Sequence, residues 1–217
     1  MIRYRAILFD LDGTLLDSVS IILNATKQVF TEMQLPYDEA AIRKSIGIPL
    51  VVQAVEWAGD RAEEFRERYR PIYNSLQEEH ARLFPNTYEM LQTVRREGLL
   101  TGVVTSKGAR GTRRALDKTG ISGLFDTVVT ADDVVLHKPH PDPILKALAD
   151  LSLEPHEALY VGDSLFDAEA ADAAGVDMAG VSWGVVSREE LLPKCSVGVF
   201  DTWEELLCGL IFCKFNP

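Results

Sequence analysis

Two short stretches of this 217-residue chain each carry a pair of aspartates. Asp10 and Asp12 lie in the stretch Asp-Leu-Asp-Gly-Thr, and Asp163 and Asp167 lie in Gly-Asp-Ser-Leu-Phe-Asp. If the fold brings these carboxylates together, their charges repel one another, and a hard divalent cation is the usual remedy. Mg²⁺ binds one or two carboxylates and keeps positions open for phosphate oxygens. We therefore expect the four aspartates to form a Mg²⁺ site.

Two other residues add to the chemistry of this group. Lys138, in a Lys-Pro turn, supplies a fixed positive charge, and Thr105, in the stretch Thr-Ser-Lys, supplies a hydroxyl donor. An anionic nucleophile, a metal, a lysine and a hydroxyl together suit phosphoryl transfer, which depends on positioning and on neutralisation of charge.

The hydrophobic pattern predicts the elements that hold these residues. A buried strand over 4–9 comes first, and after residue 85 short apolar strands alternate with helices. We expect strands at 100–105, 126–130, 158–162, 177–181 and, more weakly, 196–199, and helices at 87–97, 109–119, 141–151, 165–174 and from 202. Apolar strands between helices indicate a parallel sheet covered on both faces. The candidate residues follow the carboxyl ends of these strands, where open parallel sheets place their ligands.

A helical block separates the first strand from the others. Apolar residues recur at helical spacing from Asp17 to about Arg82, with a break at Gly47-Ile48-Pro49. The predicted fold class is therefore α/β, with a small all-helical domain inserted after the first strand. We assign residues 1–16 and 83–217 to the α/β core and 17–82 to the helical domain.

Composition and charge restrict the possible partners. Hydrophobic residues make up 47% of the chain and charged residues 25%, as in ordinary globular proteins. The net charge of −11 disfavours nucleic acid and anionic membranes as partners. The first apolar run is too short for a signal peptide or a membrane span. The three cysteines, Cys195, Cys208 and Cys213, cannot form a complete disulfide framework. We expect a cytoplasmic monomer or homodimer.

Four motifs, in order along the chain, resemble those of the haloacid dehalogenase-like hydrolase superfamily. They are Asp-Leu-Asp-Gly-Thr-Leu-Leu-Asp-Ser at 10–18, Val-Val-Thr-Ser-Lys at 103–107, Lys138-Pro139, and Gly-Asp-Ser-Leu-Phe-Asp at 162–167. The likeness covers essentially the whole chain, and the helical insert resembles the small helical cap of that superfamily. It implies a Rossmann-like parallel core, with the closest likeness to phosphoglycolate phosphatases and related pyrophosphatases.

The resemblance also implies roles for the four aspartates. Asp10 would attack phosphorus and form an aspartyl-phosphate. Asp12 would protonate the leaving oxygen and then activate the water that hydrolyses this intermediate. Mg²⁺ would sit on the Asp10 carboxylate, the Asp12 backbone carbonyl and Asp163, with Asp167 supporting it through water or hydrogen bonds.

The remaining motif residues would bind the substrate. Thr105 and Lys138 would hold the transferring phosphoryl group, with Ser106 beside them, and Gly13 would form a tight turn that brings amide donors near phosphate. In the cap, Arg43 or Lys44 would meet a substrate carboxylate. The alternative is that both are solvated cations on a helix face, and we interpret Lys107 as a surface charge at a helix start.

These features predict a Mg²⁺-dependent phosphoric monoester hydrolase acting on a small phosphorylated metabolite, best phosphoglycolate. Pyrophosphate, a sugar phosphate or a nucleotide stays open as an alternative substrate. Asp12 favours phosphate chemistry, because dehalogenating members lack this second aspartate. A phosphomutase is disfavoured because no arginine stands three residues after Gly47. A non-catalytic or receiver-like module is disfavoured by the intact Asp12 and by the helical insert.

Overall fold

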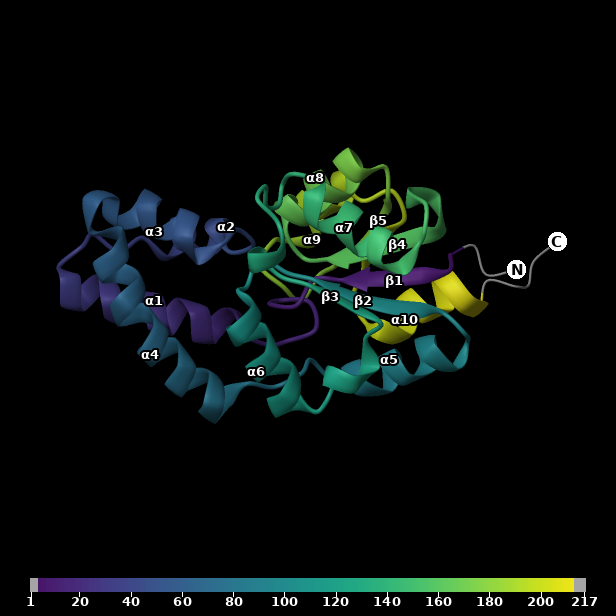
Figure 1. Ribbon diagram of the computed structural model, residues 1–217, viewed down its shortest axis with the longest axis horizontal. Coiled ribbons are helices and arrows are strands. Elements are labelled where there is room, and N and C mark those ends of the chain that lie inside the picture. The colour runs from purple at the N-terminus through teal and green to yellow at the C-terminus, as the bar shows by residue number, and fades with distance from the viewer. Residues whose placement is uncertain (1–3, 213–217) are drawn as a thin grey trace.

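The computed structural model describes residues 4–212, so Cys213 lies outside the described residues. Six strands form one parallel sheet (Figure 1). The strands are β1 (Ala6–Phe9), β2 (Leu100–Val104), β3 (Thr127–Val129), β4 (Ala158–Gly162), β5 (Asp177–Val181) and β6 (Gly198–Phe200). Their order in the sheet is β3-β2-β1-β4-β5-β6, and all neighbours run parallel. The predicted α/β class with a parallel sheet is confirmed.

The two faces of the sheet are covered by different helices, as Figure 1 shows. Helices α5 (Thr87–Arg96), α6 (Ala109–Thr119) and α10 (Trp203–Leu207) bury apolar side chains against one face. Helices α7 (Asp142–Leu151), α8 (Leu165–Ala174) and α9 (Arg188–Leu191) do so on the other. Strands buried on both faces explain why the sequence shows continuous apolar runs and no alternation.

The segment between β1 and α5 folds into four α-helices with a hydrophobic cluster of their own. They are α1 (Val19–Met33), α2 (Glu39–Ser45), α3 (Leu50–Ala58) and α4 (Ala62–His80). Phe30 stands at the centre of this cluster, edge-on to Trp57 and Phe65. The helical block lies beside the carboxyl ends of the central strands (Figure 1).

Two linkers join the helical block to the core, and they pair with each other. Leu16 and Leu83 form an antiparallel bridge. The Asp17 amide donates to the Arg82 carbonyl at 3.0 Å, and the Phe84 amide donates to the Leu15 carbonyl at 3.1 Å. The chain therefore leaves and re-enters the core at one place.

Two predictions made from composition concern the cysteines and membrane spans. Cys195 is half-buried and Cys208 is exposed, and neither forms a disulfide among the described residues. None of the helices within residues 4–212 has the length and hydropathy that crossing a bilayer requires.

Candidate active site

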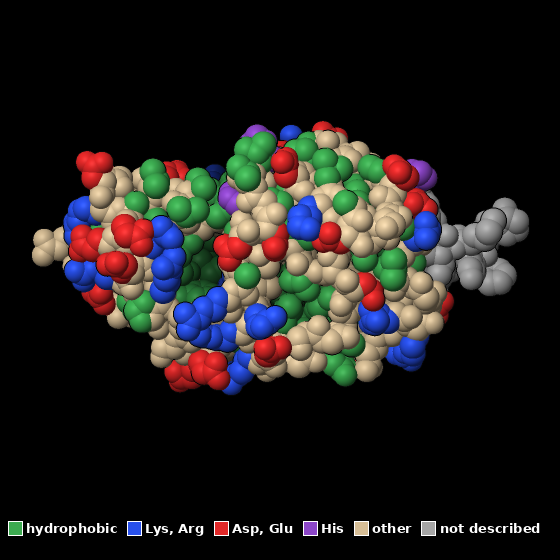
Figure 2. Space-filling model, in the orientation of Figure 1, with side chains coloured by type: hydrophobic (Ala, Val, Ile, Leu, Met, Phe, Trp, Pro, Cys, Tyr) green, Lys and Arg blue, Asp and Glu red, His purple; other side chains and the backbone are tan. Residues whose placement is uncertain are grey.

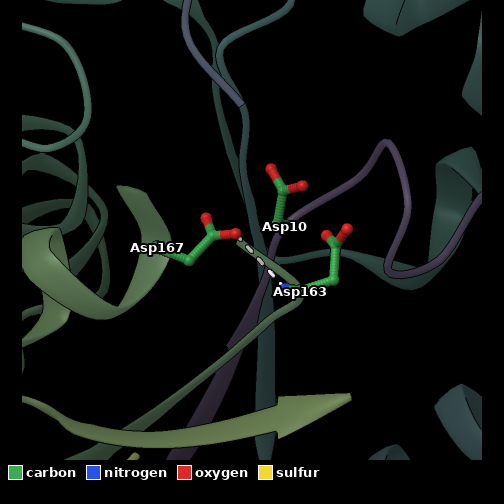
Figure 3. Close-up of side chains that lie close together, drawn as sticks. All are labelled: Asp10, Asp163 and Asp167. Atoms are coloured by element: carbon green, nitrogen blue, oxygen red, sulfur yellow. Dashed lines mark hydrogen bonds between the residues drawn. The ribbon is translucent and has the colours of Figure 1, made fainter. Parts of the chain in front are cut away.

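Three buried aspartates meet at the carboxyl ends of β1 and β4 (Figure 3). Phe9 of β1 and Val161 of β4 are register partners, and the Asp10 amide donates to the Val161 carbonyl at 2.9 Å. Asp10 directly follows β1, and Asp163 directly follows β4. Carboxylate oxygens of Asp10, Asp163 and Asp167 lie within 4.8 Å of one another. The sheet register therefore brings together residues more than 150 positions apart.

Asp167 is fixed by the start of α8. It forms a capping box with Ser164, in which each side chain bonds the backbone amide of the other. One oxygen of Asp167 accepts from the Ser164 amide at 3.0 Å and from the Ser164 hydroxyl at 2.6 Å. The other accepts from Lys138 Nζ at 2.6 Å. Both oxygens of Asp167 thus have partners within the protein.

Lys138 is fully buried between two of the aspartates. Its Nζ donates to Asp10 Oδ1 at 2.7 Å, to Asp167 Oδ1 at 2.6 Å and to the Tyr160 hydroxyl at 3.2 Å. Burial lowers the pKa of Lys138, but the attraction of Asp10 and Asp167 outweighs it and raises that pKa well above its ordinary value. Lys138 is therefore a fixed positive charge at the site, as its place in the Lys-Pro turn predicts.

The three buried carboxylates are only partly compensated by Lys138, which bonds Asp10 and Asp167. Asp163 accepts from the Thr14 hydroxyl and the Val185 amide, both at 2.8 Å, and it ion-pairs with no cation in the described part of the chain. Burial raises the pKa of Asp163 well above its usual range, and Asp10 adds to this effect. Burial also raises the pKa of Asp10 to about 7, against the pull of Lys138. One lysine among three buried carboxylates leaves a donor set that fits a divalent cation.

The Asp12 carboxylate lies outside this triad. It accepts from the Ser18 hydroxyl at 2.7 Å and from Lys107 Nζ at 2.9 and 3.1 Å. The Asp12 backbone carbonyl accepts no hydrogen bond from any described residue. The structure brings together the carboxylates of three of the four predicted metal ligands, Asp10, Asp163 and Asp167. The fourth, Asp12, could bind a metal only through its backbone carbonyl.

The prediction that Lys107 is a surface charge is wrong. Its side chain is only 12% exposed, because it lies between Asp12 and the cap residue Tyr73. Lys107 Nζ donates to the Tyr73 hydroxyl at 2.5 Å and stands 4.4 Å from the centre of that ring. Its position two residues after Thr105, at a strand end, was the signal in the sequence for a role at the site.

The structure also places the predicted phosphate-binding residues. Gly13 has a φ of +91°, and a side chain there would overlap the Asp163 carboxylate. The Thr105 hydroxyl is buried and accepts from the Lys107 amide at 3.2 Å. The Ser106 hydroxyl donates to the carbonyl of Gly47 in the cap at 2.6 Å. Ser106 therefore ties the cap loop to the core in this arrangement.

A cavity of about 560 Å³ lies between the core and the helical block. Asp10, Asp12 and Thr105 line it on the core side. On the cap side its lining includes Arg66, Tyr69, Arg70 and Tyr73 of α4. Neither arginine belongs to a motif in the sequence, although the spacing i, i+3, i+4, i+7 places all four residues on one helix face.

Arg43 and Lys44, the predicted carboxylate-binding residues, do not line this cavity. Arg43 lines a separate one of about 390 Å³, together with Phe84 and Trp183. Lys44 is exposed on α2. The role predicted for these two residues stays a prediction, and the structure gives the Asp10 cavity a different pair of cap cations.

Buried carboxylates, a lysine and hydroxyls at the carboxyl edge of a parallel sheet define an α/β enzyme built to handle phosphate. Residues 7–181 match the family model described as haloacid dehalogenase-like hydrolase. The chain belongs to this family, which confirms the resemblance found in its motifs.

Relatives of known name and structure cover most of the chain. It is 35% identical over 190 residues to a pyrophosphatase PpaX of Anoxybacillus flavithermus, covering 86% of this chain and 87% of that protein. It is 35% identical over 215 residues to a phosphoglycolate phosphatase of Yersinia pestis, covering 92% and 93%. Its structure is similar to that of a haloacid dehalogenase-like hydrolase of Streptococcus pneumoniae, with a TM-score of 0.83, 29% identity and coverage of 96% and 99%.

Proposed function

We propose that this chain is a Mg²⁺-dependent phosphatase that hydrolyses a small phosphorylated metabolite through an aspartyl-phosphate on Asp10. The observation that carries the proposal is the buried triad, in which Lys138 bridges Asp10 and Asp167 while Asp163 has no cationic partner among the described residues. Such a set neutralises a phosphoryl group and holds it against a carboxylate nucleophile.

In the first step, an oxygen of Asp10 forms a bond to phosphorus while the bond from phosphorus to the leaving oxygen breaks. Lys138, 2.7 Å from Asp10, neutralises charge on the nucleophile and the phosphoryl oxygens. The buried Thr105 hydroxyl, which lines the same cavity, donates to one of these oxygens.

Asp12 moves the protons in both steps. It gives a proton to the leaving oxygen, and in the second step it takes one from the water that attacks the aspartyl-phosphate. Inorganic phosphate then leaves, and Asp10 is regenerated. The lining of the Asp10 cavity by Asp12 supports this role.

Asp10, Asp163 and the free carbonyl of Asp12 would hold the Mg²⁺, and Asp167 would support them from its place beside Lys138. When bound, Mg²⁺ supplies positive charge that keeps Asp10 ionised and offsets the charge of the phosphoryl group. The raised pKa values of Asp10 and Asp163 support this assignment, because a bound cation stabilises the ionised form of both carboxylates.

Residues 17–82 act as a cap domain that closes over the phosphate and excludes water, on a core of residues 1–16 and 83–217. The contact between Ser106 and Gly47 supports a closure of this kind. The enzyme works in the cytoplasm, which the two free thiols among the described residues support. It acts there as a monomer or homodimer.

Phosphoglycolate is the best candidate substrate and pyrophosphate the second, since relatives at 35% identity carry both names. The test is phosphate release from phosphoglycolate, pyrophosphate, sugar phosphates, nucleotides and p-nitrophenyl phosphate, with Mg²⁺ or with EDTA. We expect Mg²⁺-dependent release that Asp10→Asn and Asp12→Ala both abolish while circular dichroism stays unchanged. Turnover retained by Asp10→Asn would rule out the covalent route.

A further inference from the structure

The cavity above Asp10 has a strongly basic rim. Arg66 and Arg70 of α4 reach it from the cap, and Arg110 of α6 reaches it from the core. Figure 2 shows Lys and Arg side chains along the edge of the hollow between the helical block and the core. Three guanidinium groups at one cavity stand out in a chain whose net charge is −11.

These guanidinium groups are available to a ligand. Arg70 and Arg110 are exposed, and neither ion-pairs with a carboxylate among residues 4–212. Arg66 pairs with Glu63, whose side chain is 62% exposed, and such a surface pair is weak and easily exchanged. By contrast, Arg68 on the same helix is held by Glu64 at 2.9 Å and does not line the cavity.

The charge of the rim is more than a single phosphoryl group requires. Lys138, together with a cation held by the triad, would already neutralise the group that Asp10 attacks. Planar guanidinium groups bind carboxylates and phosphates through paired hydrogen bonds, so the rim suits another anion on the part of the substrate that points away from Asp10.

We infer that Arg66, Arg70 and Arg110 form a subsite for a second anionic group, so that the substrate is a phosphate compound with a carboxylate or a second phosphate at its other end. This inference rests on the proposed function and deepens it. It moves the recognition of that group from Arg43 to one face of α4 and the start of α6.

The test is calorimetric titration of the Asp10→Asn chain with Mg²⁺, so that no turnover occurs. One pair of ligands is phosphoglycolate and 2-hydroxyethyl phosphate, which differ in the carboxylate. The other pair is pyrophosphate and inorganic phosphate. We expect the ligand with the second anionic group to bind more tightly in at least one pair, and that pair identifies the group as carboxylate or phosphate.

Arginine variants then locate the preference. The double variant Arg66→Gln with Arg70→Gln should raise the Kd of the preferred ligand about tenfold, and so should Arg110→Gln alone, since each removes charge-assisted hydrogen bonds. The Kd of the ligand without the second anionic group should change less than about twofold. Arg68→Gln is the matched control on α4 and should change neither ligand.

Three results contradict the subsite: a preference that survives these variants, an equal loss for both ligands of a pair, and a preference removed by Arg43→Gln instead. Phosphate release by the unaltered chain tests the proposed function separately. An inactive chain with an arginine-dependent preference contradicts the phosphatase alone. An active chain without that preference contradicts the subsite alone.

Discussion

The position of the Asp163 carboxylate depends on two glycines that pack against it. Gly13 and Gly184 both approach its carboxylate so closely that a Cβ on either one would overlap it. Thr14 and the Val185 amide then fix the two oxygens. With glycine backbone packed against it, the carboxylate cannot swing away from Asp10, so the triad is set before any ligand arrives.

Gly13→Ala should therefore damage the site as well as the fold. The added methyl displaces Asp163, and the positive φ is strained for alanine, so we expect a loss of about 1–3 kcal/mol in stability. Mg²⁺-dependent phosphate release should fall by at least about tenfold. Chemical denaturation and a Mg²⁺ titration of activity measure the two effects.

Gly59→Ala is the control for this variant. Gly59 also has a positive φ, +53°, but no atom lies within 4 Å of the position of its missing Cβ. It should lose about 1–2 kcal/mol of stability through backbone strain and keep its activity. Equal activity in the two variants would show that the Gly13 contact does not position Asp163.

At the scale of elements, one lysine joins the helical block to Asp12, the proposed proton donor. Lys107 follows β2, contacts both oxygens of Asp12, and donates to Tyr73 on α4. A shift of α4 therefore acts directly on Lys107 and through it on Asp12. We expect the cap to influence proton transfer as well as substrate binding.

Lys107→Met should lower turnover according to the leaving group. The glycolate that leaves from phosphoglycolate needs a proton from Asp12 on its alcohol oxygen. The kcat of Lys107→Met on phosphoglycolate should therefore fall about 10- to 100-fold. p-Nitrophenolate leaves without a proton, so the same variant should lose less than about threefold on p-nitrophenyl phosphate. Tyr73→Phe should also lose more kcat on phosphoglycolate than on p-nitrophenyl phosphate, with smaller losses on both.

Lys118→Met provides a matched control for this prediction. Lys118 also spans from the core to the cap, since it lies on α6 and pairs with Glu78 of α4 at 3.4 Å, but it is 40% exposed and makes no hydrogen bond to Asp12 in the described part of the chain. Its loss should affect neither substrate. Equal losses on both substrates in Lys107→Met would contradict a role in proton delivery.

The elements themselves were largely predictable, because their apolar residues recur with a clear period. Helices 109–119 and 165–174 and strands 158–162 and 177–181 agree with the structure at both ends. Strand β3 is shorter than predicted, since the Asp126 side chain accepts from the Thr101 amide at 2.8 Å and Thr130 begins a capping box. Side chains that bond to backbone at strand ends are a tertiary effect that periodicity does not report.

The site was predictable where motifs lie at strand ends, and not where it depends on the cap. Asp10, Thr105 and Asp163 could be placed because parallel strands bring their carboxyl ends together. The contact between Lys107 and Asp12 joins residues 95 positions apart, and no local pattern predicts it. Charged residues such as Arg70 on an amphipathic helix usually face solvent, so their place at a cavity needed the structure.

For the molecule as a whole, the buried triad makes stability depend on pH and on metal. The folded pKa of Asp10, about 7, lies above its ordinary value of 3.8, and that of Asp163 is raised as well. Between these pH values the folded chain binds protons that the unfolded chain has lost. Without metal, this contribution to stability is therefore lost as pH rises from about 4 to about 7.

Mg²⁺ should reverse that loss, because it binds the ionised carboxylates of the folded state. Thermal denaturation with Mg²⁺ or EDTA should show a larger rise in Tm at pH 8 than at pH 5. Asp163→Asn should remove most of the Mg²⁺ effect. Asp132→Asn is the control, since Asp132 lines the cavity but bonds the Ala109 amide, outside the triad. A Mg²⁺ effect that is the same at both pH values would contradict this account.

The paired linkers at Leu16 and Leu83 also bear on how such an enzyme can change over generations. The two ends of the helical block lie side by side, so the block can be replaced or lost as one unit. A short turn from residue 16 to residue 83 would close the core without stretching any strand. Insertions, deletions or exchanges within the helical block alter which molecules are admitted and leave the carboxylates at the sheet edge in place. The same catalytic core can in this way evolve to act on new metabolites.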